Sequence, residues 1–201
     1  MTELLSGQAH VRALLTALPE LDTDRIDEWG RHLAGLLVGG GRLLVAGNGG
    51  SAAQAQHLTA ELVGRYRDDR PGLSALCLSA ESSSVTAISN DYGFDQVFAR
   101  QVQAHGRPGD VLLVLSTSGR SGNLLAAVDA AAAGGLTGWA LTGPGPNPLS
   151  RRPDVEVLCV DAAAAATVQE VHQVAVHLLC AAVDLQVGAD RSSSALTGAR
   201  Q

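Results

Sequence analysis

Short apolar runs alternate along the chain with longer segments whose apolar residues recur every three or four positions. The uninterrupted runs predict strands that are buried on both faces, because a parallel strand covered by helices need not alternate. The longer segments predict amphipathic helices. Together they predict an α/β fold, a flavodoxin-like three-layer sandwich around a five-stranded parallel sheet. The expected strands are residues 43–46, 73–79, 111–115, 136–141 and 155–160.

Two extra helices are expected before the first strand, one over residues 2–18 and one that opens at 21–23 and stops at Gly39. Their apolar faces predict packing against the sheet or against another subunit. A cluster of turn-forming residues at 90–93 predicts a turn, after a helix capped by Ser82–Ser84. The last helix is expected over residues 167–187. Residues 188–201 predict a disordered tail, so a single folded domain is expected to span residues 1–187.

Two strand-to-helix junctions have a similar composition. Residues 47–51 (GNGGS) follow the first strand, and residues 116–121 (STSGRS) follow the third. Backbone N–H groups at a helix N-terminus attract anions, and the second junction adds four hydroxyl groups, so both junctions predict a phosphate site. Residues 47–52 also fit the GxGxxA dinucleotide fingerprint. That alternative expects an acidic residue about 20 positions further on, and the nearest candidate, Glu81, is further away.

Two helices carry residues with acid/base or metal-binding chemistry. His57 and Glu61 are four positions apart, so they share a helix face, as do Gln169, Gln173 and His177 on the last helix. A histidine on an apolar helix is more often a core or interface residue than a ligand. If the two helices met, however, two histidines, a glutamate and a glutamine could form a Zn²⁺ site. The spacing along the chain does not decide whether they meet.

Composition excludes several classes of function. The net charge of −6 argues against nucleic acid or an anionic membrane surface as the main partner. The chain contains no lysine, which excludes a Walker A lysine and a Schiff base. Cys77, Cys159 and Cys180 are widely spaced in apolar runs and are expected to be buried, reduced thiols, typical of the cytoplasm. No signal peptide and no membrane span are expected.

Four stretches resemble the sugar isomerase (SIS) family, and closely its phosphoheptose isomerases. They are spread over nearly the whole predicted fold. Their residues are GNGGSAAQAQHLTAELVGRY (47–66), TAISNDYGFDQVFARQV (86–102), GRPGDVLLVLSTSG (106–119) and VQEVHQVAVHLLC (168–180).

The resemblance implies isomerisation of D-sedoheptulose 7-phosphate to D-glycero-D-manno-heptose 7-phosphate through an enediol(ate). It implies Glu61 and His177 as the acid/base pair, and one zinc ion per subunit. The implied zinc ligands are His57, Glu61, Gln169 and His177. The implied substrate-binding residues are Asn48, Gly49, Gly50, Ser51, Glu61, Asn90, Asp91, Ser116, Thr117, Ser118, Ser121 and Gln169. The family also implies a homotetramer with active sites between subunits, in which the helices of residues 1–39 take part.

Two alternatives stay open at the level of sequence. One is a non-catalytic SIS protein that binds a partner such as a replication initiator; proteins of that kind lack the acid/base pair, which is present here. The other is an SIS isomerase for a different sugar phosphate. Three departures bear on substrate identity: Arg120 stands where many relatives have Asn, Gly122 where many have Pro, and a run of alanines at 162–166 where many have polar residues.

Overall fold

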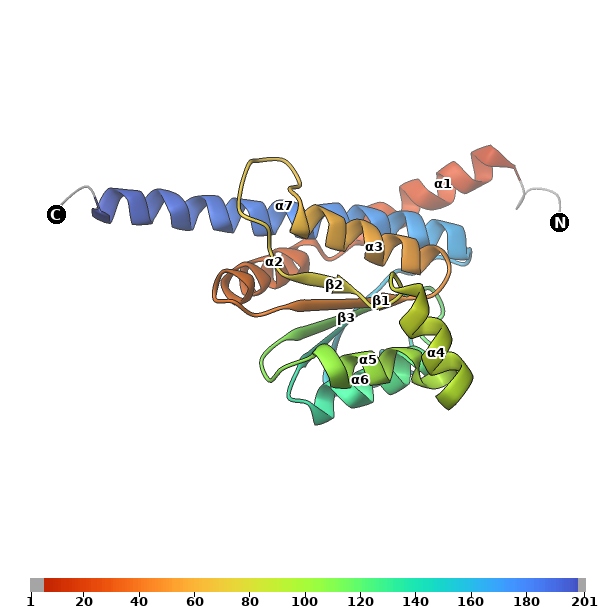
Figure 1. Cartoon of the computed structure of the whole chain (residues 1–201). Coiled ribbons are helices and arrows are strands. Elements are labelled where there is room, and N and C mark those ends of the chain that lie inside the picture. The colour runs from red at the N-terminus through yellow and green to blue at the C-terminus, as the bar shows by residue number, and fades with distance from the viewer. Residues whose placement is uncertain (1–5, 199–201) are drawn as a thin grey trace.

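Five parallel strands form one sheet in the computed structural model of the chain, which describes residues 6–198 (Figure 1). The strands lie in the order β2-β1-β3-β4-β5, which confirms the predicted parallel α/β sandwich. β1 and β3 are buried along their whole length, as their uninterrupted apolar runs require. The strand bounds are β1 (Leu43–Gly47), β2 (Ala75–Cys77), β3 (Val111–Ser116), β4 (Thr137–Thr142) and β5 (Val155–Cys159).

Helices cover both faces of the sheet (Figure 1). On one face lie α2 (Thr23–Val38), α3 (Gly50–Val63) and α7 (Ala165–Gly198). On the other lie α4 (Ser82–Tyr92), α5 (Val97–His105) and α6 (Gly122–Ala133). α1 (Gly7–Ala17) projects from one end of the molecule, and two short 3₁₀ turns, η2 (Leu18–Glu20) and η3 (Phe94–Gln96), precede α2 and α5.

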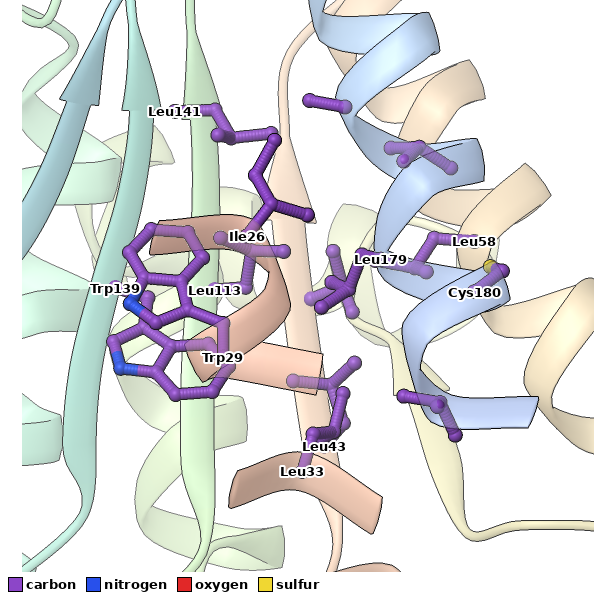
Figure 2. Packing of buried hydrophobic residues seen from close by; sticks show 14 of the residues in the cluster. Ile26, Trp29, Leu33, Leu43, Leu58, Leu113, Trp139, Leu141, Leu179 and Cys180 are labelled. Carbon is purple, nitrogen blue, oxygen red and sulfur yellow. The ribbon is translucent and has the colours of Figure 1, made fainter. Parts of the chain in front are cut away.

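α2 is part of the core of the chain. Its apolar face packs between the sheet and α7, and Trp29 stacks on Trp139 of β4 with ring centroids 4.6 Å apart (Figure 2). The N-terminal helices were expected to pack against the sheet or against another subunit, and α2 packs against the sheet. α1 differs, because Val11 and Leu15 are exposed and only Ala17 is buried.

Three local predictions were wrong. Residues 90–92 form the end of α4 instead of a turn, and Gly93 follows with φ of +85°. The cap of α4 is Glu81, whose carboxylate accepts hydrogen bonds from the N–H groups of Ser83 and Ser84. Those bonds lower the pKa of Glu81 to about 2. Only Cys180 is a buried thiol, since Cys77 is half-buried and Cys159 is exposed.

α7 continues to Gly198, so the backbone of residues 188–198 is helical where a disordered tail was expected. A helix already formed against a core propagates at little free-energy cost, and one glycine opposes it by only about 1 kcal/mol. Residues 1–5 and 199–201, which belong to the predicted first helix and tail, lie outside the described part of the chain.

α7 also contains a long apolar segment. Of the described residues, Ala165–Gly188 is long and apolar enough to cross a membrane by length and composition, yet half of its most apolar window is buried inside the structure. Such burial is typical of a core helix.

Candidate active site

The two predicted anion-binding junctions lie side by side. β1 pairs with β3, and Gly47 is opposite Leu115, so the loops that follow both strands meet at the carboxyl edge of the sheet. Their side chains are joined: Asn48 donates from Nδ2 to Oδ1 of Asn123 at 3.0 Å, and Asn123 donates back at 2.9 Å. Asn123 is buried at the start of α6, so this pair of hydrogen bonds fixes one junction against the other.

Glycine allows the first junction to turn tightly into α3. A Cβ atom at Gly47 would lie 2.6 Å from the backbone of Ser51, so any side chain there would push the helix away. Gly49 has a φ of +55°, which favours glycine, and α3 begins at the next residue. α3 therefore starts almost directly after β1, with its N-terminus at the carboxyl edge of the sheet.

A cavity of about 80 Å³ lies between the two junctions. It is bounded by the N-termini of α3 and α6, which both favour an anion. Hydroxyl and amide groups dominate its surface, and among residues 6–198 no charged side chain lines it. The lining residues are Asn48, Ser51, Leu115, Ser116, Thr117, Ser118, Ser121 and Gln169. The structure therefore brings together seven of the predicted substrate-binding residues around one anion-sized space.

Gln169 reaches the cavity from α7. Its amide packs against Gly50, where a Cβ atom would lie 2.5 Å from Gln169 Nε2. The main-chain carbonyl of Gln169 accepts a 2.6 Å hydrogen bond from Gln54 Nε2 of α3, a side chain that the sequence analysis did not single out. The start of α7 is therefore held against the first turns of α3.

Further along the same two helices, two imidazoles and a carboxylate meet. His57 Nε2 lies 3.0 Å from His177 Nε2 and 3.4 Å from Glu61 Oε1. The rings of His57 and His177 are edge to face, with centroids 5.1 Å apart. The meeting of the two helices, which spacing could not decide, is thus a feature of the structure.

Two residues that sequence reasoning did not assign also contact His177. Gln173 Nε2 lies 3.2 Å from His177 Nε2, and the Tyr66 ring stacks on the imidazole with centroids 5.8 Å apart. Gln173 had a visible signal, because it lies one turn before His177 on the same helix face. Tyr66 comes from the loop after α3, where helical spacing gives no signal in the sequence.

His172 holds α7 against the sheet. Its Nε2 donates to the carbonyl of Thr142 at the end of β4, 3.1 Å away, and the side chain is fully buried. Burial lowers the pKa of His172 to about 4, and the hydrogen bond to Thr142 offsets this only in part. His172 is therefore a neutral structural residue that places α7 over the carboxyl edge of the sheet.

Asn90 and Asp91 are not brought to this site within one chain. Both are exposed at the end of α4, where Asn90 Nδ2 donates to Asp91 Oδ1 at 2.9 Å. Among the described residues, no hydrogen bond or ion pair joins either side chain to the cavity or to His57, Glu61 and His177.

The donors at His57 fit zinc in chemical type. Imidazole and carboxylate are common zinc ligands, and tetrahedral ligands with bonds of about 2.0–2.1 Å lie about 3.3 Å apart. The observed separations of 3.0 and 3.4 Å are close to that spacing. Within residues 6–198, however, no group of three or more His, Cys, Asp or Glu side chains is gathered as a metal site. His57, Glu61 and His177 instead contact one another directly, and this cluster would have to open slightly around an ion. Gln169 lies apart from it, against Gly50.

Residues 8–143 match the family model of the SIS domain. The phosphoheptose isomerase of Streptomyces coelicolor is 70% identical over 78% of this chain and 67% of that protein. The phosphoheptose isomerase of Thiobacillus denitrificans is 48% identical over 88% of this chain and 90% of that protein. Among solved structures, a phosphoheptose isomerase from Francisella tularensis aligns with a TM-score of 0.82 at 36% identity, covering 89% of this chain and 94% of the other. The Neisseria gonorrhoeae enzyme aligns with a TM-score of 0.77 at 37% identity, covering 87% and 92%.

Proposed function

The chain belongs to the SIS domain family, and from that premise we propose that it isomerises D-sedoheptulose 7-phosphate to D-glycero-D-manno-heptose 7-phosphate. The observation that carries the proposal is the cluster of His57, Glu61 and His177, formed by α3 and α7, each of which also contributes a residue to the lining of the cavity. A carboxylate and an imidazole in contact form a general acid/base system.

The arrangement along α3 suits a long sugar phosphate. Ser51 lines the cavity at the start of the helix, and His57 lies six residues later, about 9 Å along the helix axis. A phosphate held in the cavity would leave the other end of an extended seven-carbon sugar near Glu61 and His177. The hydroxyl groups and N–H groups of the cavity would bind the phosphate oxygens.

The reaction moves one proton between neighbouring carbons. A base removes a proton from C1 of the ketose while the C2 carbonyl oxygen gains one, which gives an enediol. Loss of the C1 hydroxyl proton and return of a proton to C2 then give the aldose, so atoms and electrons balance. We assign these transfers to Glu61 and His177 as a pair. Which of the two acts on carbon and which on oxygen is left open.

Zinc would be held by His57, Glu61 and His177, with Gln169 as the fourth ligand. When bound, one ion per subunit would supply positive charge for the substrate oxygens. Donor type and spacing at His57 support the two histidines and the glutamate as ligands. The Gln169 amide lies against Gly50 and would have to turn toward the ion.

We propose a homotetramer in the cytoplasm, with sites completed between subunits. The exposed Val11 and Leu15 of α1 offer apolar surface for such contacts. Asn90 and Asp91, the two predicted substrate-binding residues that remain apart from the cavity, would then serve a site shared with a neighbouring subunit.

The alternatives differ in what they need. A non-catalytic SIS protein has no use for Glu61 and His177 gathered around His57 across two helices. An isomerase for another sugar phosphate would keep this cluster. It would differ beside the cavity, at Arg120 and Gly122.

The test is isomerisation of D-sedoheptulose 7-phosphate by wild type, Glu61→Gln and His177→Ala, with and without added zinc. We expect turnover by wild type and loss of turnover in both variants. Glu170→Gln on α7 is the matched control, because Glu170 contacts His10 of α1 instead of the cluster. An inactive, folded and tetrameric wild type would contradict the proposal.

A further inference from the structure

A buried ion pair joins the two helices that carry the acid/base cluster. Arg70 Nε donates to Asp184 Oδ1 at 2.6 Å, and the two side chains are only 3% and 5% exposed. Asp184 lies on α7, two turns after His177. Arg70 lies in the loop that follows α3, nine residues after Glu61.

The remaining donors of Arg70 cap α3. Nη1 donates to the carbonyl of Leu62 at 2.8 Å, and Nη2 donates to the carbonyl of Glu61 at 2.9 Å. The last carbonyls of a helix have no partner within it and carry partial negative charge, so a cation is favoured there. Arg70 thereby holds the helical turn from which the Glu61 side chain projects.

The second oxygen of Asp184 holds the loop beside His177. It accepts a hydrogen bond from the N–H of Arg67 at 3.2 Å, directly after Tyr66. Tyr66 is the residue whose ring stacks on His177. One buried pair therefore contacts the backbone of Glu61 on one side and anchors the Tyr66–His177 stack on the other.

Cys180 lies among these charges. The pKa of its thiol is raised to about 12, first by burial and then by the negative charges of Glu61 and Asp184. The ion pair and Cys180 therefore lie in one poorly solvated region, in which small displacements change electrostatic energies strongly.

We propose that Arg70 and Asp184 are positioning residues for the isomerisation: they set the spacing of Glu61 and His177. This inference rests on the proposed function. Stability alone is a weak reason for such a pair, because apolar side chains of similar volume are often as stabilising as a buried ion pair. Geometry is a stronger reason, since a misplacement of about 1 Å can reduce a catalysed rate about 100-fold.

The test variant is Arg70→Lys, which keeps the charge but loses the fork that reaches several carbonyls at once. We expect kcat to fall at least about 10-fold while KM for the sugar phosphate changes less than about 3-fold. The split follows because the anion cavity lies at the other end of α3.

Asp110→Asn is the matched control for lost stability. Asp110 is also buried and accepts hydrogen bonds from the N–H groups of Arg42 and Arg107, but it lies before β3, at the edge of the sheet remote from the site. We expect it to lower Tm without lowering kcat. An unchanged kcat in Arg70→Lys, or an equal fall in Asp110→Asn, would overturn the proposal.

A second measurement does not depend on turnover. The imidazole NMR resonances of His57 and His177 should move in Arg70→Lys and stay in place in Asp110→Asn, and unmoved resonances in Arg70→Lys would overturn the proposal. If Arg70→Lys does not fold, the double variant Arg70→Met/Asp184→Leu takes its place with the same expected outcomes. A wild type without isomerase activity would contradict the proposed function, and the resonances would still decide this inference.

Discussion

His57 Nε2 lies 3.0 Å from His177 Nε2, although the two residues are 120 positions apart in the chain. Only one of these two nitrogens can carry the hydrogen of the contact, so the other presents a lone pair. Glu61 lies beside the same His57 nitrogen, and Gln173 beside the His177 nitrogen. The contact joins α3 to α7, and the predictions for Glu61 and for zinc binding depend on it.

Replacement of Glu61 by Gln should lower kcat by roughly 10²–10⁴-fold, because a carboxylate able to move a proton becomes an amide that cannot. KM for D-sedoheptulose 7-phosphate should change little, since the anion cavity is intact. Steady-state kinetics of Glu61→Gln beside Glu170→Gln measures the effect. Activity of Glu61→Gln within a factor of three of the control would contradict the role of Glu61.

Replacement of Gly50 by Ala should raise KM about 10-fold. The new Cβ atom would lie 2.5 Å from Gln169 Nε2 and displace that amide from the cavity, and a lost hydrogen bond of about 1.4 kcal/mol is tenfold in affinity. Stability should change little, because the displaced atoms end a flexible side chain.

The control is Gly7→Ala, at the first position of α1, where a Cβ atom meets nothing within 4 Å. It should leave KM unchanged. Equal KM values for the two variants would show that Gln169 does not contribute to substrate binding.

His172 should make the protein less stable at acid pH. The pKa of His172 is about 4 in the folded protein, below the usual value of about 6.5 in an unfolded chain. Between these values the unfolded chain binds the proton and the folded protein does not. The contribution of His172 is therefore present above pH 6.5 and is lost as the pH falls toward 4, by up to about 3 kcal/mol.

Urea unfolding at pH 7 and pH 4.5 measures this loss, with His172→Gln for comparison. The variant is expected to be less stable at pH 7, because its bond to the Thr142 carbonyl is altered, but to lose less free energy of unfolding on acidification. Identical pH dependence in the two proteins would contradict a neutral, buried His172.

Removal of metal by a chelator should lower both Tm and activity if zinc binds at His57, and zinc should restore both. A ligand that binds the folded state alone raises its stability by mass action, by about 2.7 kcal/mol at 100 times Kd. His57→Ala should abolish the zinc-dependent change in Tm. His105→Ala is a suitable control, because His105 ends α5 on the opposite face of the sheet. A zinc effect on Tm that survives in His57→Ala would place the metal elsewhere.

The sequence by itself determined the strands, most helices and both glycine- and serine-rich strand-to-helix junctions, because each depends on neighbours in the chain. Uninterrupted apolar runs became the buried strands β1 and β3, and the glycine–serine segments became the ends at which α3 and α6 begin. Local sequence patterns predicted less accurately where a helix ends. The end of α4 and the extension of α7 beyond residue 187 depend on whether a helix that is already packed continues.

Only the tertiary structure decided which side chains meet. The strand order places β1 beside β3, so that Asn48 contacts Asn123, and the packing of α3 on α7 places His57 against His177. The amide beside His177 is that of Gln173, while Gln169 faces Gly50, and Arg70 reaches both Glu61 and Asp184. Helical periodicity gives the direction of a side chain from its own helix and says nothing of the helix opposite. The contacts that form the site result from burial of apolar faces across the whole fold, which no single stretch of sequence encodes.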